Sequence, residues 1–351
     1  MQESTPMTGP LKLEASLHET IWGGSNLAAL AGKQLPLGVR VGESWETEVG
    51  NRVVSGAFAG MTLAQVVERQ GEDLLGARAI AAFGQRFPLL AKFIDAHDQL
   101  SVQVHPNDDY ARVHAGGKLG KTEAWYVLHT EPGAQLVYGL ARDTTEDEVR
   151  AAIADNRLEA LLHSFSVHPG DVVFVPAGTV HAIGAGVVLY ELQEYSDITF
   201  RLYDYGRLQA NGQARELHVA DGLKVMRFHP SHPDTVTPVS LSAAPPGMRR
   251  RVLIACHYFV LEEMTLDGTA QEVTRPSSCE ILSMLAGECE VVPPGGESVH
   301  LRVGETVVLP AHLGCFDLRG TAARCLRSYV PEEDDALLLR WQAMQPTGDR
   351  G

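Results

Sequence analysis

The chain has 351 residues, of which 44% are hydrophobic, enough to fill the cores of roughly two domains of about 150 residues each. Asp and Glu number 44 against 29 Lys and Arg, and the resulting formal charge of -15 argues against nucleic acid as a partner. The sequence contains neither a basic leader nor a stretch of about 18 apolar residues, so we expect a cytoplasmic protein without membrane contact.

Short apolar runs separated by Gly, Pro or Asp follow one another from residue 87 to residue 195. Their length and spacing are typical of β-strands joined by tight turns, and not of alternating strands and helices. The sequence therefore predicts a mainly β protein, built as a sandwich or a barrel. The runs are FPLLAKFIDA, LSVQVHP, EAWYVLH, AQLVYGL, DVVFVPAG and GVVLYELQEY.

Two helical segments interrupt the strands. Thr62 with Gln65 has the pattern of a capping box, which predicts a helix over residues 63–83. Residues 144–165 begin with acidic side chains and continue with apolar residues at helical spacing, which predicts a second helix. We expect both helices to cover the sheet. The turn-rich residues 208–250 read as a connection, partly helical at most.

A twelve-residue pattern occurs twice. GDVVFVPAGTVH begins at Gly170 and GETVVLPAHLGC begins at Gly304, without a gap in the alignment. This repeat predicts two copies of one barrel, in a domain of residues 1–235 and a domain of residues 236–351. His181 of the first copy aligns with Cys315 of the second, so we expect a metal in the first copy alone.

Polar side chains in the first copy are arranged to meet at one point. Side chains alternate along a strand, so Ser101, Gln103 and His105 share a face. If the neighbouring strands carry Glu123 and His181 to the same place, two imidazoles, a carboxylate and an amide can hold a metal. Mixed nitrogen and oxygen ligands suit an ion with a position open to substrate. The alternative is a set of ordinary hydrogen-bonded or exposed polar residues.

The order of SVQVHP, KTEAWY, PAGTVHAIG and ELQEYSDITFRLYDYGR resembles the short bacterial type I mannose-6-phosphate isomerases, and GDVVFVPAGTVH resembles the second cupin motif. IWGGSNL and GESWE, nearer the start, add to a similarity that spans most of residues 20–207. The resemblance implies two cupin jelly-roll barrels, the second degenerate. It also implies one zinc ion per chain, with other divalent ions possible, and interconversion of mannose 6-phosphate and fructose 6-phosphate.

The resemblance also implies a set of site residues. The metal ligands would be Gln103, His105, Glu123 and His181, and the active-site positions would be Lys92, Lys121, Glu191, Asp197 and Arg201. The sequence departs from the family at Thr122, where many relatives have Pro, and it lacks the long helical insertion of larger members.

The chemistry of such an isomerase fits these residue types. A proton must leave the carbon beside the carbonyl and return to its neighbour, while charge develops on oxygen. Lys121 and Glu191 are both candidates for the proton transfer, although Glu191 can equally be a salt-bridge partner. Arg201 is the best candidate to bind phosphate.

Further polar residues are candidates for the substrate pocket. Ser101 and Lys118 are candidate substrate-binding residues beside Arg201, although Lys118 also reads as an ordinary surface charge. Asp197 either orients Arg201 or the pocket hydroxyls, or caps a turn.

Two other functions compete with the isomerase. An iron cupin dioxygenase fits less well, because an amide ligand and several cationic residues suit a phosphorylated hexose better than an apolar oxygenation pocket. A noncatalytic sugar-phosphate sensor would not need the proton-transfer set. The sequence leaves the oligomeric state open.

Overall fold

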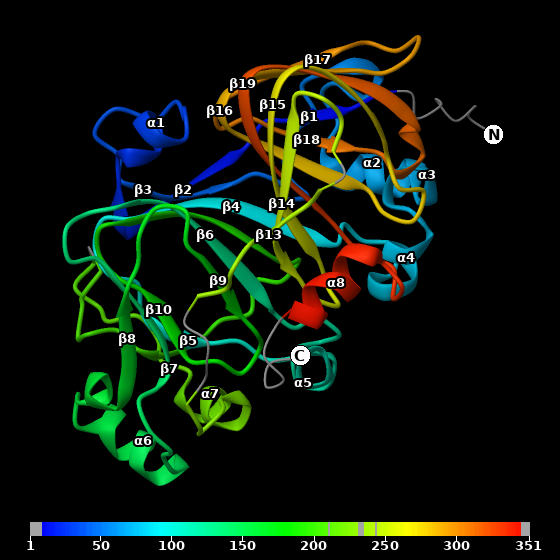
Figure 1. Cartoon of the computed structure of the whole chain (residues 1–351). Coiled ribbons are helices and arrows are strands. Elements are labelled where there is room, and N and C mark those ends of the chain that lie inside the picture. The colour runs from blue at the N-terminus through cyan, green and yellow to red at the C-terminus, as the bar shows by residue number, and fades with distance from the viewer. Residues whose placement is uncertain (1–8, 210, 231–234, 243, 345–351) are drawn as a thin grey trace.

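The computed structural model describes residues 9–209, 211–230, 235–242 and 244–344 (Figure 1). Its strands form three antiparallel sheets, so the prediction of a mainly β protein is confirmed. The six-stranded and five-stranded sheets face each other in the lower left half of Figure 1, and a third sheet, called the C-terminal sheet here, lies at the upper right. Within these ranges, no helix combines the length and apolar character needed to cross a membrane.

The six-stranded sheet has the order β2 (Ser16–Gly24), β3 (Val41–Trp45), β4 (Leu89–Ala96), β11 (Val187–Glu194), β6 (Glu123–Thr130) and β9 (Val172–Val175). The five-stranded sheet has the order β12 (Phe200–Tyr203), β5 (Val102–Val104), β10 (His181–Ile183), β7 (Gln135–Leu140) and β8 (Leu162–Ser166).

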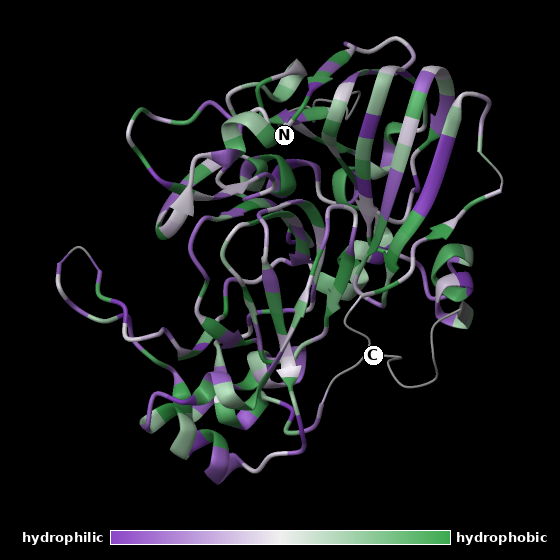
Figure 2. Ribbon diagram, turned by 60° about the vertical axis from the view of Figure 1, so that its left-hand side comes forward, coloured by the Kyte–Doolittle hydropathy of each residue, from purple (hydrophilic) through white to green (hydrophobic). Residues whose placement is uncertain are grey.

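The C-terminal sheet has the order β1 (Leu11–Leu13), β18 (Thr306–Leu309), β16 (Glu280–Val292), β19 (Cys315–Tyr329), β15 (Val260–Val273), β14 (Met248–Ala255) and β13 (Val239–Ser240), with β17 (Val299–Arg302) paired to β16. Hydrophilic and hydrophobic residues alternate along its long strands in Figure 2, as expected of strands with one face in a core. Closure of the sheets into two barrels stays a prediction.

The helices pack around these sheets. They are α1 (Asn26–Leu30), α2 (Leu63–Gln70), α3 (Glu72–Leu75), α4 (Ala77–Phe83), α5 (Asp108–His114), α6 (Glu146–Ala154), α7 (Val219–Val225) and α8 (Ala336–Met344). Short 3-10 turns occupy Gly56–Phe58, Leu158–Leu161 and Ala311–Leu313.

Both helical predictions were too long. The capping box of Thr62 and Gln65 is present, but residues 63–83 form α2, α3 and α4, because Gly71 and Gly76 take positive φ values of 48° and 85°. In the second segment α6 ends at Ala154, and residues 162–166 form β8. Asn156 takes a φ of 53°, which stops the helix, and the following residues pair with β7.

One apolar core joins the six-stranded and C-terminal sheets. Val188, Tyr190 and Leu192 of β11 belong to the same buried cluster as Ile281 of β16 and Leu326 of β19. The alternate residues of β11, including Glu191, therefore point to the opposite face. The space between the six-stranded and five-stranded sheets holds a second apolar cluster, which includes Trp125, Leu189 and Ile183, and the polar residues of β11 share that space.

The division of the chain at residue 235 stays a prediction. Strands β13 to β19 all lie in the C-terminal sheet, as a boundary near that residue requires. Strand β1, however, pairs with β18, with Leu11 opposite Val308. The start of the chain thus completes the C-terminal sheet.

The two copies of the sequence repeat occupy equivalent strands. Val175, in β9, lies opposite Glu123 of β6, and the residue that matches Val175 in the repeat, Leu309, lies opposite Glu280 of β16. The register of the two strand pairs is therefore the same.

The first glycine of the repeat distinguishes the two copies. Gly304 has a φ of +78°, and a Cβ there would lie 1.6 Å from the carbonyl oxygen of Ala31. Gly304→Ala should therefore lower the free energy of unfolding by more than about 3 kcal/mol, since backbone must move. The matching Gly170→Ala, with a φ of +97° and open space around it, should cost about 1 kcal/mol. Denaturant unfolding compares them, and equal losses would contradict the packing argument.

Candidate metal and catalytic site

Strand register brings the candidate residues together between two sheets. In the five-stranded sheet, Gln103 of β5 lies opposite His181 of β10 on one side and opposite Arg201 of β12 on the other. In the six-stranded sheet, Glu191 of β11 lies opposite Lys92 of β4. The alternation predicted for β5 is confirmed, because Val102 and Val104 are buried in an apolar cluster on the other face.

Three of the four predicted metal ligands lie close together. The candidate ligand atoms of His105, Glu123 and His181 all lie within 4.8 Å of one another, and all three side chains are buried. Nε2 of His181 is 3.3 Å from Oε1 of Glu123, and Nε2 of His105 is 3.6 Å from Oε2. These atoms surround a position that a single ion can occupy.

Backbone contacts orient both imidazoles. Nδ1–H of His105 donates to the carbonyl oxygen of Ile198 at 2.7 Å, and Nδ1–H of His181 donates to that of Thr179 at 2.9 Å. Each Nε2 is then the unprotonated nitrogen. Burial lowers the pKa of His181 to about 4, and burial with the Lys121 ammonium lowers the pKa of His105 well below its usual range. Both rings are therefore neutral, as metal ligands must be.

Gln103 completes the set from the side of β5. Its amide Nε2 is 3.3 Å from Nε2 of His181. A half turn of the amide exchanges its nitrogen and oxygen, which places an oxygen at the same point. The predicted fourth ligand thus lies beside the other three.

The orphan atoms of the site fit a divalent cation. Nε2 of His105 and both carboxylate oxygens of Glu123 are buried without a hydrogen bond. Oε2 of Glu123 does have an ion-pair contact, at 2.8 Å from Nζ of Lys121. Buried acceptors without donors are costly, and an ion bound between them removes that cost.

Alternating charges extend from the metal position along the six-stranded sheet. Nζ of Lys121 is 2.8 Å from Glu123 and 3.9 Å from Glu191. Nζ of Lys92 is 3.2 Å from Glu191 and 3.5 Å from Glu43. Each ammonium therefore lies between two carboxylates, which holds both lysines in place with little exposure to water.

The two carboxylates that flank Lys121 differ in basicity. Burial alone would raise the pKa of Glu191, but the ammonium groups of Lys121 and Lys92 outweigh it and lower the pKa to about 2. Burial, with the charge of Glu191 adding to it, raises the pKa of Glu123 to about 7. Glu191 is thus an ionised, weakly basic group, whereas Glu123 gains strongly from a nearby cation.

Arg201 is placed as a binder of anions. Its Nε donates to Oγ of Ser101 at 3.3 Å and its Nη1 donates to the carbonyl oxygen of Glu216 at 2.9 Å. No carboxylate of the described residues forms an ion pair with it, whereas the neighbouring Arg207 and Arg215 share Asp204. The guanidinium therefore lies beside the strand of Gln103 without a direct carboxylate partner among the described residues.

Asp197 and Lys118 do not join this group. The two side chains form an ion pair of 2.7 Å with each other, and both are more than half exposed. Asp197 therefore neutralises Lys118 at the surface, and a role for Asp197 in orienting Arg201 stays a prediction. Both residues lie in loops, whose path the strand pattern does not specify.

Glu43 and Trp45 belong to the site but were not predicted as functional residues. The ring of Trp45 lies 4.6 Å from Nζ of Lys92, and its indole N–H donates to Glu43. Trp125 also donates, to Oε2 of Glu191 at 3.1 Å. Alternation along GESWE places Glu43 and Trp45 on one face of a strand, and this pattern was the signal in the sequence that could have identified them as site residues.

Comparison with known proteins identifies the family. Residues 11–132 match the model of the phosphomannose isomerase type I catalytic domain, and residues 250–330 match that of the mannose-6-phosphate isomerase cupin domain. Mannose-6-phosphate isomerase ManA of Bacillus subtilis is 38% identical over 328 residues, which are 92% of this chain and 99% of the relative. The chain belongs to the type I phosphomannose isomerases.

Further proteins resemble this chain in sequence or in fold. The mannose-6-phosphate isomerase of Streptococcus mutans is 35% identical over 90% of this chain and 96% of its own length. The crystal structure of mannose 6-phosphate isomerase from Bacillus subtilis superposes with a TM-score of 0.81 at 30% identity, covering 92% of this chain and 99% of that one. The apo enzyme of Salmonella typhimurium, 18% identical with a TM-score of 0.70 over 93% and 100% of the two chains, shares the fold. Family membership implies a divalent metal, and the cluster of His105, Glu123 and His181 fits one.

Proposed function

We propose that this chain interconverts mannose 6-phosphate and fructose 6-phosphate, with one zinc ion bound by Gln103, His105, Glu123 and His181. The observation that supports this most is the convergence of two neutral imidazoles and a buried carboxylate whose acceptor atoms lack hydrogen bonds. Two nitrogen and two oxygen donors without thiolate suit zinc at a catalytic centre. The bound ion would act as a Lewis acid toward the oxygen that becomes negative.

The reaction requires two proton shifts and no external oxidant. One proton moves from C2 to C1 of the sugar and another from the C2 hydroxyl to the C1 oxygen. Lys121 is the proton-transfer candidate that we favour, because Glu191, with a pKa of about 2, is a weak base. Glu191 instead positions the ammonium groups of Lys92 and Lys121, which it contacts at 3.2 Å and 3.9 Å.

The phosphate of the substrate would bind at Arg201 and Ser101. A phosphate carries nearly two negative charges, and Arg201 is a cation near the site with which no carboxylate of the described residues forms an ion pair. The chain is acidic as a whole, so this local charge is what makes an anionic substrate acceptable. We keep the cytoplasmic location and the absence of a nucleic-acid partner as predictions.

Replacing Arg201 with alanine should reduce kcat/KM about 100- to 1000-fold, because an oriented charged donor is lost. Bound metal should stay constant, since Arg201 is not among the candidate ligands. Lys118→Ala is the matched control: that ammonium is exposed and already paired with Asp197, so its loss should change kcat/KM less than about fivefold. Steady-state kinetics with metal analysis of both variants tests this, and unchanged kinetics in Arg201→Ala would show that the phosphate binds elsewhere.

The activity itself has a direct test. Purified protein should convert mannose 6-phosphate to fructose 6-phosphate in a coupled assay, lose activity after dialysis against a chelator, and regain it with zinc. Dialysis against buffer alone is the control. Absence of turnover with zinc, manganese, cobalt and iron would remove the proposal, and consumption of oxygen would favour the dioxygenase.

A further inference from the structure

Strands of the C-terminal sheet pair in the same register as the strands that carry Glu191, but charged residues of the opposite sign stand at the equivalent positions. Glu191 lies opposite Lys92 and opposite Trp125 of its two neighbouring strands. Arg327 of β19 lies in the same way opposite Glu262 of β15 and opposite Leu282 of β16. The ammonium–carboxylate pair of the first site therefore corresponds to a carboxylate–guanidinium pair in the second.

The metal ligands also have counterparts in this register. Cys315, which matches His181 in the repeat, lies opposite Val273, as His181 lies opposite Gln103. Two residues after Val273 comes Arg275, in the place of His105, and its Nη1 is 3.0 Å from Oε1 of Glu280. A guanidinium thus contacts the counterpart of Glu123, and the ligand set for a metal is gone.

A cavity of about 880 Å³ lies at this second position. It is separate from the site described above, because none of the candidate catalytic side chains lines it. Its lining includes three guanidinium groups and one carboxylate, those of Arg250, Arg275, Arg327 and Glu272. Glu262 and Glu280 lie behind them with no exposed surface. Glu262, Glu272 and Glu280 balance the charges of the three guanidinium groups, so what a ligand would meet is the outward edges of Arg250 and Arg275.

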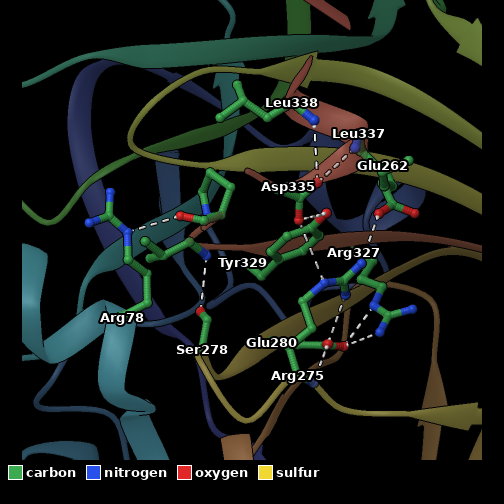
Figure 3. A network of polar contacts seen from close by, with 12 residues as sticks. Arg78, Glu262, Arg275, Ser278, Glu280, Arg327, Tyr329, Asp335, Leu337 and Leu338 are labelled. Carbon is green, nitrogen blue, oxygen red and sulfur yellow. Dashed lines mark hydrogen bonds and ion pairs between the residues drawn. The ribbon is translucent and has the colours of Figure 1, made fainter. Parts of the chain in front are cut away.

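Two of the guanidinium groups keep donors for a ligand. Arg327 is fully engaged between Glu272 and Glu280, as Figure 3 shows for Glu280. Arg250 donates from Nε and Nη2 to Glu262, but its Nη1 is 3.9 Å from Glu272. Arg275 donates from Nη1 to Glu280, but its Nη2 is 4.0 Å from Glu262. These separations are too long for hydrogen bonds.

We propose that this cavity binds the phosphate group of a small molecule, through the guanidinium edges of Arg250 and Arg275. Planar guanidinium groups match phosphate oxygens in pairs, and two of them converge here on a cavity large enough for a phosphorylated monosaccharide. The phosphate can come from a sugar phosphate or from free inorganic phosphate. The inference does not depend on the zinc or the base assigned above.

Cys315 provides a reporter inside this cavity. It lines the cavity and is exposed, whereas Cys256, Cys279, Cys289 and Cys325 are buried. Alkylation with iodoacetamide, followed by mass spectrometry of the intact enzyme, therefore measures access to one thiol. At a ligand concentration of about ten times Kd, bound phosphate should slow alkylation roughly tenfold, because only the free form reacts. Mannose without phosphate should not slow it.

A matched pair of variants tests the charge requirement. Val273 is 58% exposed, and a side chain there can change without disturbing the buried ion pairs. Val273→Asp should abolish protection by repelling the anion, and Val273→Asn should keep it. Each variant is compared with itself in the presence and absence of ligand. Arg201→Ala should retain protection, which separates this cavity from the active site.

The ligands distinguish the source of the phosphate. Equal protection by inorganic phosphate and mannose 6-phosphate would mean that the phosphate group alone is recognised, and stronger protection by the sugar phosphate that the sugar contributes. The proposal is overturned if neither ligand protects Cys315, if uncharged mannose protects it equally, or if Val273→Asp retains the full effect.

Discussion

Replacing His181 with alanine should abolish isomerisation and lower the amount of bound metal. The change removes Nε2, which lies 3.3 Å from Oε1 of Glu123, and with it one of two nitrogen donors. The loss of affinity should exceed the roughly 10- to 100-fold that removal of an outer-shell partner causes, because a ligand atom itself is lost. Metal analysis of the purified variant, together with kcat/KM for mannose 6-phosphate, measures both effects.

His168→Ala is the matched control for this substitution. Its side chain is 78% exposed and lies 3.7 Å from Asp171, away from the candidate ligands. Metal content and activity should be unchanged in this variant. A His181→Ala protein that is both fully metallated and active would contradict the site, because the other ligands would then suffice without it.

Replacing Lys121 with methionine should lower kcat about 100- to 10,000-fold, the range expected for loss of a proton-transferring side chain. Methionine keeps most of the volume of the buried chain and removes its ammonium. The metal should remain bound, because the nitrogen of Lys121 contacts Glu123 and is not a candidate ligand. KM should change little if Lys121 acts on the reacting carbons and not on the phosphate. Steady-state kinetics and metal content give the result.

Glu191→Gln distinguishes the two proton-transfer candidates. The amide keeps the shape of the carboxylate and removes the charge that Lys92 and Lys121 share. A positioning role predicts a smaller loss of kcat than in Lys121→Met, with a changed pH profile, because both lysines lose a stabilising partner. A larger loss in Glu191→Gln than in Lys121→Met would reverse the assignment and make Glu191 the base.

The strands were predictable from the sequence because each depends on a local pattern. Alternation along β5 separates Val102 and Val104 from Gln103, and the structure places the two sets on opposite faces. Helix lengths were less predictable. Apolar spacing continues through residues 63–83, but two glycines with positive φ divide the segment into separate helices. The spacing of apolar residues alone does not show where such breaks fall.

The site was predictable to the extent that strands carry it. His105, Glu123 and His181 come together from strands or strand ends, and alternation along SVQVHP had placed Gln103 and His105 on one face. Contacts made by loops were not predictable. The ion pair of Lys118 with Asp197 joins two loops, and no periodic pattern in the sequence predicts that these loops lie close together.

The pairing of β1 with β18 affects how the chain can reach its native state. Leu11 is synthesised long before Val308, so the whole intervening segment must be made before these strands can meet. Contacts between distant parts of a chain form slowly, and the edge of β18 stays available to other molecules until then. Misassembly during refolding should therefore begin at this edge, and a fragment without the first strand should aggregate more readily than the intact chain.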